Sequence, residues 1–470
     1  MGDAFVNLFR NPARVFVILT DISFNMALEN ICRFLNSIKN DQVPQKVTEY
    51  GKLILADNIG VILKGTEVPE SVGFSEEMAK LFSSEGKSMD FLSKRRLGVL
   101  GAATCNSFYG RVLKFDDEYN PGMIHPGSMI IPPLISFSED GEVSGQNFLT
   151  ALIAGYEVTA RISESLMPSH YRRGFSPTLT LGPLGACAAI CAADSKSVEK
   201  TAIALTITAF SAGGTRNDMD IQQVDLSPYE AAVSSTRGII GYLSSASVNV
   251  PVYDFLLPDS SFVKNYSEDF DQSKITTGLG KNWHMMGTSF KYYPGDRLFQ
   301  GPVHLLMKLM KKNDLYGEGL KELEVGVNSY IIEKIEESRK KGEKFSELER
   351  MLGMVLKNQN LDILAVSGNS KKDPEIKEYI SKIRIYLDDE CDDFYPEKWL
   401  SKIIFHTMDN ATISEKIDWL EILHPDLESL KKKFMDNTSS LEGKRRIELW
   451  NAIMNIDQME TVRELTSLLL

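Results

Sequence analysis

The chain has few cysteines, and their distribution excludes a disulfide-stabilised scaffold. Its 470 residues include only five cysteines, an odd and scattered set that favours reduced thiols in a cytoplasmic protein. Cys187 and Cys191 lie four residues apart in a stretch of small residues, so they share one face of an expected helix. Without a neighbouring histidine or a further cysteine, the pair indicates helix packing rather than a metal or iron–sulfur site.

Long hydrophobic runs and an excess of basic residues are also missing. The apolar run at residues 15–19 is too short to span a bilayer, and no small-residue cleavage site follows it. We therefore expect residues 1–22 to form an N-terminal extension of a protein that is not exported. Asp and Glu total 64 against 52 for Lys and Arg, a net charge of −12, so neither nucleic acid nor a membrane is an expected partner.

The common cofactor and protease motifs are absent as well. The segment 278–281, Gly-Leu-Gly-Lys, lacks the spacing of a phosphate-binding loop and does not follow an expected strand. No His/Glu spacing of a zinc protease occurs, and no Ser/His/Asp triad can be assembled from motifs. The sequence therefore predicts no nucleotide cofactor and no metal site.

Helical periodicity dominates the first 320 residues. Apolar residues recur at spacings of three and four from residue 24, and the helix that begins after Pro44 is apolar on almost every side between residues 53 and 63. Asp57 is the single charge in that stretch and needs a buried partner. The small residues of segment 182–213 predict closely packed central helices. Further helices are expected at residues 76–84, 93–109, 145–165, 182–194, 197–213, 229–247 and 302–312.

Alternation typical of strands begins only after residue 320. The candidate strands are at residues 323–327, 383–387 and 402–408, with helices expected at about 346–359 and 374–381 between the first two. This pattern predicts a mainly α protein with two domains. The larger, all-helical domain comprises residues 23–279 and 406–470, and a smaller inserted α+β lid domain comprises residues 280–405. Helices are expected to resume at about residue 411.

Residues 104–128 hold the first cluster of chemically useful side chains. Asp116, Asp117 and Glu118 stand together, and adjacent carboxylates that are partly buried are candidates for acid–base chemistry or metal binding. From the spacing alone, helix capping and exposed charge are the more common explanation of the same pattern. His125 precedes Pro126 on the loop that follows, where the imidazole has either a structural role or a place in a cleft.

Two further clusters place basic residues at a helix start and at a domain boundary. Arg172 and Arg173 precede the helix expected at residue 182, and guanidinium groups beside a helix N-terminus favour carboxylates. The segment 290–297, Phe-Lys-Tyr-Tyr-Pro-Gly-Asp-Arg, lies at the expected junction between the domains, where ligand clefts usually form.

In order and spacing, several motifs resemble the MmgE/PrpD family over most of the chain from about residue 27. These motifs are Ala56-Asp57-Asn58-Ile59-Gly60, Phe115-Asp116-Asp117, His125-Pro126-Gly127, Gly155-Tyr156-Glu157-Val158 with Arg161, Gly174-Phe175 with Pro177-Thr178, Gly182 with Gly185-Ala186, Phe290-Lys291 with Tyr293-Pro294, and Phe345-Ser346. The resemblance implies an all-helical domain with an α+β lid, a homodimer, and a small di- or tricarboxylate substrate handled without an organic cofactor.

The resemblance also implies roles for individual residues. His125 and Lys291 match the histidine and lysine that line the family's cleft, so we expect His125 to be a general base or acid and Lys291 to hold a carboxylate. The other catalytic candidates are Asp116 and Asp117, which would position His125, and Tyr293 and Asp296, which would orient the substrate or donate a proton. The substrate-binding candidates are Arg172, Arg173, Ser176, Arg297 and Gln300.

The sequence departs from the family pattern at several positions. The departures are Lys114, where the family usually has an acid, Arg111, where it often has a histidine, Ser176, in place of the histidine of Gly-Phe-His-Pro, and Glu349, where many members have a tyrosine. No equivalent of the family's substrate-binding lysine occurs around residues 222–227. The resemblance therefore supports the family's fold for this chain better than it supports any one reaction of the family.

Asp296 and Gln300 look like the acid and glutamine of the bacterial methylcitrate dehydratases. The resemblance therefore favours a lyase that dehydrates a small carboxylate, as 2-methylcitrate dehydratase does in propionate metabolism, by removing a proton next to a carboxylate. Two alternatives stay open: an epimerase, isomerase or decarboxylase of the same family, and a carboxylate-binding paralogue without activity. An acidic protein with acidic substrates needs a local excess of cations. The cations expected to meet in one cleft are Arg172, Arg173, Lys291 and Arg297.

Overall fold

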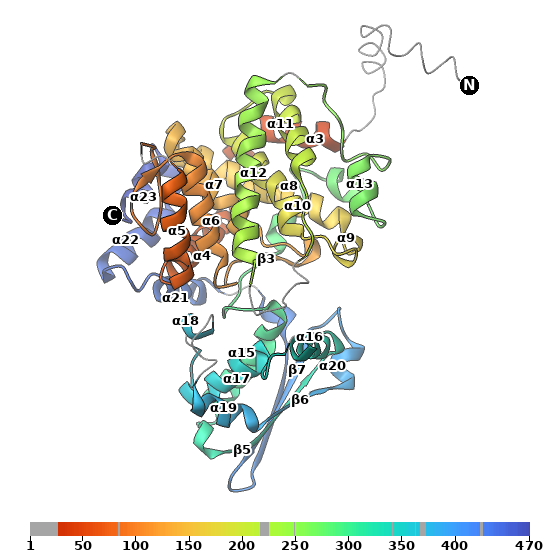
Figure 1. The fold of residues 1–470 in the computed structure, drawn as a ribbon, viewed down its shortest axis with the longest axis vertical. Helices are drawn as coiled ribbons and strands as arrows, with labels where there is room; N and C mark the ends of the chain where they lie inside the picture. Colours follow the sequence, from red (N-terminus) through yellow and green to blue (C-terminus); the bar gives the residue numbers. More distant parts are fainter. Residues whose placement is uncertain are drawn as a thin grey trace, which may run out of the picture.

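The computed structural model describes residues 27–82, 85–216, 225–248, 250–340, 342–361, 363–366, 373–423 and 426–470. The described chain is mainly α-helical, and a four-stranded sheet lies in its second half (Figure 1). None of the described helices has the length and apolar character needed to cross a bilayer. The extension expected at residues 1–22, and the first half of the stretch 222–227, lie outside the described residues.

Helices form both the first and the last parts of the chain, and the two sets pack together. The first set comprises α3 (Ala27–Ser37), α4 (Gln45–Gly65), α5 (Pro69–Leu81), α6 (Val99–Arg111), α7 (Gly127–Gly141), α8 (Gly145–Leu166), α9 (Ser169–Arg172), α10 (Pro177–Ala193), α11 (Val198–Ser211), α12 (Ser227–Ser247), α13 (Ser261–Tyr266) and α14 (Ser273–Thr276). The last set comprises α21 (Leu427–Asn437), α22 (Gly443–Met454) and α23 (Val462–Ser467). Figure 1 shows the last set, in blue, beside α4–α7, and Phe434 and Trp450 share an apolar core with Ile54 and Ile62.

Helix α4 is buried on almost every side, and its interior acid has the partner that the sequence required. The Asp57 side chain is fully buried and forms an ion pair of 2.7 Å with the Lys433 Nζ of α21. Burial raises the pKa of Asp57, and the Lys433 charge opposes that shift. This pair therefore joins the C-terminal helices to the N-terminal set through a contact that water does not screen.

Breaking this pair is expected to destabilise the fold strongly. Lys433→Ala leaves the Asp57 carboxylate buried without its cation, which costs about 3–5 kcal/mol of the free energy of unfolding. Urea denaturation followed by circular dichroism measures the loss. The neighbouring Lys432 is exposed, so Lys432→Ala is the matched control and is expected to change stability little. Equal losses in the two variants would contradict the assignment.

The central helices pack closely because of their small residues. A Cβ atom added to Gly155 of α8 would lie 2.6 Å from the Cβ of Ala189 on α10, and one added to Gly185 of α10 would lie 2.1 Å from the Thr159 Oγ1 of α8. Either distance is too short for a real contact, so these positions require glycine. The prediction of tight packing in segment 182–213 is confirmed for α10.

Several helix boundaries differ from the prediction, and some helices were not predicted. Helix α5 begins at Pro69 instead of residue 76, and α10 begins at Pro177 because the Ser176 side chain accepts a hydrogen bond from the Leu179 amide and caps it. Helix α7 was not predicted at all. It contains Pro132 and Pro133, which remove backbone donors and usually end a helix, but both are buried among neighbouring helices.

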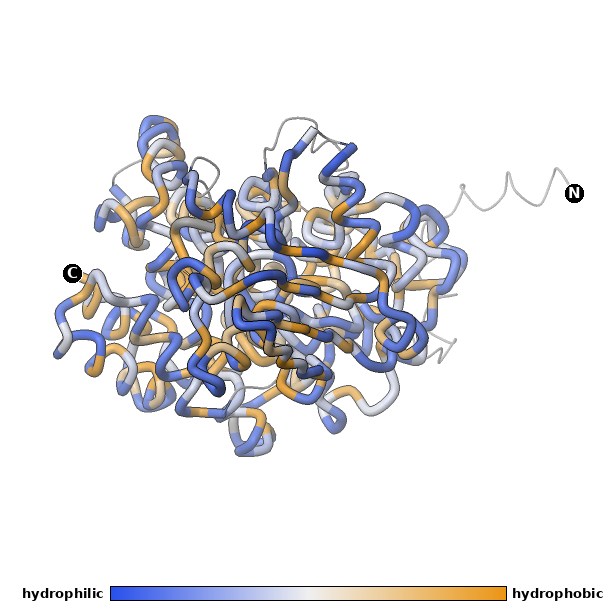
Figure 2. The backbone as a smooth tube through the Cα atoms, turned by 90° about the horizontal axis from the view of Figure 1, so that it is seen from below, coloured by the Kyte–Doolittle hydropathy of each residue, from blue (hydrophilic) through white to orange (hydrophobic). Residues whose placement is uncertain are grey.

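The four-stranded sheet contains β5 (Leu320–Val327), β6 (Ile383–Leu387), β7 (Leu400–Thr407) and β8 (Thr412–Asp418), in the order β6-β5-β7-β8. Strand β5 is parallel to β6 and antiparallel to β7, with Val325 opposite both Ile385 and Ile403. The associated helices are α15 (Gln300–Lys312), α16 (Ser329–Lys340), α17 (Glu347–Asn358), α18 (Ile363–Val366), α19 (Pro374–Ser381) and α20 (Asp389–Asp393). Figure 2 views this region from the sheet side, where hydrophilic and hydrophobic residues intermix.

The three predicted strands are confirmed, whereas the prediction that helices resume at residue 411 is wrong. Residues 412–418 form β8, which pairs with β7 at the edge of the sheet and has no fully buried residue. Its polar sequence follows from that edge position, and helices resume only at α21. Helix α16 was also missed, because only Ile331 on it is buried and its apolar periodicity is weak. The sheet region has its own apolar core, which shares no buried residue with the cores of the helical part.

Candidate active site

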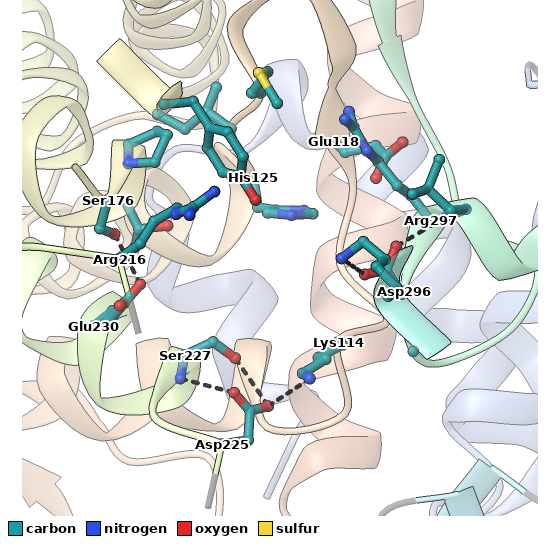
Figure 3. Close-up of a pocket in the computed structure, with 18 of the residues that line it drawn as sticks. Lys114, Glu118, His125, Ser176, Arg216, Asp225, Ser227, Glu230, Asp296 and Arg297 are labelled. Atoms are coloured by element: carbon teal, nitrogen blue, oxygen red, sulfur yellow. Dashed lines mark hydrogen bonds and ion pairs between the residues drawn. The ribbon is translucent and has the colours of Figure 1, made fainter. Parts of the chain in front are cut away.

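A cavity of about 710 Å³ lies where the helical part meets the sheet region. Its lining residues are spread along the chain between Arg111 and Lys340, so distant parts of the chain converge on it; among them are His125, Ser176, Arg216, Lys291 and Lys334. Figure 3 shows His125 and Ser176 on one side and Asp296 and Arg297 on the other. A cavity of this size suits a small organic substrate.

His125 is held with one ring nitrogen bonded and the imidazole on the cavity wall. Its Nδ1 lies 3.0 Å from the backbone carbonyl oxygen of Asp117. Because a carbonyl oxygen only accepts, Nδ1 carries the proton, and Nε2 has the lone pair. Burial and the nearby charges of Arg111 and Lys291 lower the pKa of His125 well below 6.5. The ring is therefore neutral at pH 7 and can accept a proton at Nε2.

Asp117 positions His125 and does not line the cavity. Its Oδ1 accepts a hydrogen bond of 3.0 Å from the amide of Gly127, the first residue of α7, and its Oδ2 accepts one of 2.8 Å from the Tyr156 hydroxyl of α8. Together with the backbone contact to His125, these bonds fix both ends of the His125–Gly127 loop. This geometry supports the positioning role expected from the sequence.

The protonation of Asp117 predicts an effect of pH on stability. Burial, with Asp116 and Asp57 nearby, raises the pKa of Asp117 from 3.8 to about 7 in the folded protein. The folded state thus binds this proton more tightly than the unfolded state, so the stability that it contributes is complete below pH 3.8 and is lost as pH rises through about 7. We expect the Tm to fall between about pH 5 and about pH 8, and to fall less in Asp117→Asn.

Differential scanning calorimetry measures this difference between the variants. Asp140→Asn changes an exposed acid on α7 and serves as the control. The Tm of this control is expected to depend on pH in the same way as the Tm of the unchanged protein. If Asp117→Asn and Asp140→Asn gave the same pH dependence, the proposed protonation of Asp117 would be wrong.

Asp116 is fully buried, and its charge is matched within the site. Its Oδ1 accepts a hydrogen bond of 2.6 Å from Arg111 Nη1, at the position where the family often has a histidine. Arg111 lines the cavity and Asp116 does not. Asp116 therefore reaches the cavity through its contact with Arg111, and its charge also acts on Lys291.

Lys291 and Arg297 are cations on the cavity wall, as the sequence predicted. Lys291 Nζ donates a hydrogen bond of 2.7 Å to the Lys114 carbonyl, and burial lowers the pKa of Lys291. Arg297 Nη1 donates one of 2.8 Å to Asn120 Oδ1, and its guanidinium lies 5.3 Å from the centre of the Trp399 ring. Within the described chain these hydrogen-bond acceptors are neutral, so both charges can serve an anionic ligand.

The predicted convergence of four cations is wrong for Arg172 and Arg173. Both lie outside the cavity lining, and Arg173 pairs with Glu268 at the surface. Arg216 lines the cavity instead, with its guanidinium 4.3 Å from the centre of the Tyr171 ring. The sequence around Arg216 contains no motif that predicts a place in the site. A backbone bridge between Phe175 and Thr215 brings this segment to the cavity, and the local sequence does not reveal that pairing.

Besides Arg111, two family departures within the cavity are each paired with an acid. Lys114 forms an ion pair of 3.3 Å with Asp225, and the Ser176 hydroxyl donates a hydrogen bond of 2.9 Å to Glu230 Oε2. The remaining departure, Glu349, lies outside the cavity lining, where it completes a capping box with Ser346 at the start of α17. Lys114 and Ser176 therefore both have acidic partners, and Glu349 stabilises a helix start.

Among the remaining predicted residues, only Asp296 lines the cavity. It pairs with Lys334 Nζ at 2.7 Å, and this charge, together with the Leu298 amide, keeps its pKa well below its usual range. The Tyr293 hydroxyl lies 3.1 Å from His304 Nδ1, outside the cavity lining. Gln300 is buried and bonds the backbone of residues 292 and 293. Contact of Tyr293 or Gln300 with a ligand is therefore not supported; both hold the segment that presents Lys291.

Comparison with known proteins supports the family resemblance. Residues 29–246 match the family model of the MmgE/PrpD N-terminal domain, so the resemblance drawn from the motifs is confirmed. The cis-aconitate decarboxylase-like protein oryM of Aspergillus oryzae is 25% identical over 306 residues, which cover 60% of this chain and 61% of that protein. A cis-aconitate decarboxylase of Aspergillus terreus is 24% identical over 298 residues, or 60% of each chain. The chain thus spans about six tenths of the length of these relatives.

Proposed function

We propose that this chain is a lyase of the MmgE/PrpD type that removes a proton next to a carboxylate of a small di- or tricarboxylate. The observation that carries this proposal is the neutral His125, whose Nε2 lone pair is available in a cavity that also presents Lys291 and Arg297. A base and two cations are what such a proton abstraction needs.

The proposed reaction begins when a substrate carboxylate binds Lys291 and Arg297. His125 Nε2 then takes the proton from the carbon beside the carboxylate, and the electrons of the broken C–H bond move toward the carboxylate. The buried charge of Lys291 stabilises the negative charge that develops there. In a dehydration, the C–O bond to the neighbouring hydroxyl then breaks, a proton joins the leaving oxygen, and water and a C=C bond result.

The protonation of His125 favours dehydration over decarboxylation. When carbon dioxide leaves, the electrons of the broken C–C bond remain on carbon and a proton donor must supply a proton. His125 is held as a neutral proton acceptor, which suits abstraction from carbon instead. Decarboxylation stays an alternative because the matched relatives are named cis-aconitate decarboxylases. Epimerisation also stays open, because it begins with the same abstraction.

A carboxylate-binding paralogue without activity is the remaining alternative. Lys114 and Ser176 replace residues of the family pattern, but Asp225 and Glu230 pair with them in the cavity. This compensation supports a rebuilt site rather than a decayed one.

The same proposal assigns a role to the sheet region. We propose that it is an inserted lid domain, with the larger helical domain formed by residues 23–279 and the C-terminal helices, and that the protein is a homodimer. The separate core of the sheet region supports an independent lid. The pairing of β8 with β7 extends the proposed lid beyond residue 405 to Asp418.

A substrate screen in deuterated buffer tests the proposed function. Proton NMR of 2-methylcitrate, citrate, isocitrate, malate and cis-aconitate with the protein separates the alternatives in one experiment. Water loss with formation of a C=C bond supports dehydration. Loss of carbon dioxide would instead identify a decarboxylase, and deuterium exchange with inversion alone an epimerase. If no acid reacted while one raised the Tm, the inactive paralogue would be the correct interpretation.

A further inference from the structure

Glu118 is a buried acid at the cavity that the reaction above leaves without a role. It lies in β3 (Glu118–Tyr119), which pairs with β4 (Thr288–Ser289) so that Glu118 is opposite Ser289. The Ser289 hydroxyl also donates a hydrogen bond of 3.3 Å to the Glu118 carbonyl. This pairing fixes Glu118 beside the segment that carries Lys291.

One oxygen of the Glu118 carboxyl group lacks a hydrogen-bond partner among the described residues. The residue is only 3% exposed, yet it lines the cavity, and its Oε2 has no hydrogen-bond partner within the described chain. A buried carboxylate without partners is costly, so the protonated form is favoured. Burial raises the pKa of Glu118, although the charges of Arg297 and Lys291 act in the opposite direction.

The position of Glu118 complements that of His125. Figure 3 shows the His125 ring pointing toward the side of the cavity where Glu118 and Arg297 lie. His125 is a proton acceptor at Nε2, and Glu118 is a candidate proton donor. A base and an acid that reach one cavity from different segments are the arrangement that an elimination requires.

The other acids of the cavity are less suited to donate a proton. Asp225 and Asp296 are paired with lysines, and interactions in the site lower the pKa of each. Glu230 accepts a hydrogen bond from Ser176, and Glu333 and Glu337 are exposed. Glu118 is therefore the acid that burial and the absence of a partner distinguish.

We propose that Glu118 is the catalytic acid that protonates the leaving oxygen of the substrate. As the C–O bond breaks, its electron pair takes the proton of the Glu118 carboxyl group, and water and the Glu118 carboxylate result. His125 holds the proton taken from carbon, and transfer of protons through water restores both groups. This inference rests on the proposed function, because a decarboxylation would not need a leaving oxygen to be protonated.

The test separates proton abstraction from loss of water. In deuterated buffer, with any hydroxy acid of the screen that the unchanged protein dehydrates, Glu118→Gln is expected to slow water loss by about 100-fold or more. It is expected to keep exchange of the carbon-bound proton within a few-fold, because His125 remains. Glu118→Ala, which retains the backbone pairing of β3 with β4, provides a second variant if the first does not fold. Glu336→Gln, an exposed position on α16 outside the cavity lining, is the matched control.

The outcomes distinguish this inference from the proposed function. Water loss by the Glu118 variants within a few-fold of the unchanged rate would overturn the role of Glu118 and leave the proposed function intact. If the Glu118 variants slowed proton exchange and water loss by the same factor, the role of Glu118 would also be overturned, since Glu118 would then act through His125. If the unchanged protein neither exchanged nor dehydrated any acid, the proposed function itself would fail, and the inference with it.

Discussion

Replacing His125 with asparagine is expected to lower kcat/KM by about 100- to 10,000-fold, the usual contribution of a general base. The amide group of asparagine can still donate to the Asp117 carbonyl, so the loop should keep its conformation. What disappears is the Nε2 lone pair that faces the cavity. The loss should therefore fall mainly on kcat, because substrate binding depends on Lys291 and Arg297.

Steady-state kinetics on the acid identified by the screen measure this loss. His406→Asn, on β7 and outside the cavity lining, is the control for a histidine substitution and should retain the unchanged kcat. Both variants should keep the Tm of the unchanged protein within a few degrees. A His125→Asn variant with kcat within a few-fold of the unchanged value would show that another group takes the proton.

Replacing Lys291 with methionine is the second substitution with a large expected effect. Methionine preserves most of the buried volume but removes the charge that would bind the substrate carboxylate and stabilise the negative charge developing on it. Loss of one such interaction costs about 100- to 1,000-fold in kcat. Because the same charge also binds the ground state, KM should rise as well.

The matched control is Lys311→Met, at an exposed lysine of α15. It should leave both kinetic constants unchanged. If Lys291→Met raised KM alone, Lys291 would be a binding residue without a role in stabilising the developing charge. If neither constant changed, Arg297 or Arg216 would be the residue that holds the carboxylate, and the account of Lys291 would be wrong.

The fold was predictable where one face of an element is strongly apolar. Helix α4, with its continuous apolar stretch and its need for a partner to Asp57, followed directly from the residues. Helix α7 did not, because two consecutive prolines argue locally against a helix that tertiary packing nevertheless stabilises. Strand β8 and helix α16 were not predicted for a related reason: each is mostly exposed, so neither has a strong periodic pattern.

The candidate site was predictable only in part. His125, Lys291, Arg297 and Asp296 were named from local motifs, and the structure brings them to one cavity. Arg216 was missed, and Arg172 and Arg173 were wrongly included, because adjacency to a helix start does not determine which way an arginine points. These contacts depend on pairings between distant segments, such as that of β3 with β4, which a single sequence does not reveal.

The net charge of −12 also acquires a more specific meaning. The cavity does not counter this negative charge with a cluster of unpaired cations. Three of the cations on its walls, Arg111, Lys114 and Lys334, each form an ion pair with an acid. Lys291 and Arg297 remain available for a ligand, and two cations match a substrate with two carboxylates. We therefore expect two carboxylates of the substrate to contact these two residues.

The most direct test of the central claim is the appearance of solvent deuterium at the carbon next to the substrate carboxylate. NMR of substrate recovered from deuterated buffer measures it for the unchanged protein and for His125→Asn. We expect deuterium at that carbon with the unchanged protein and at least about 100-fold slower incorporation with His125→Asn. Conversion of the substrate with every proton on that carbon retained, or equal incorporation by the two proteins, would contradict the central claim.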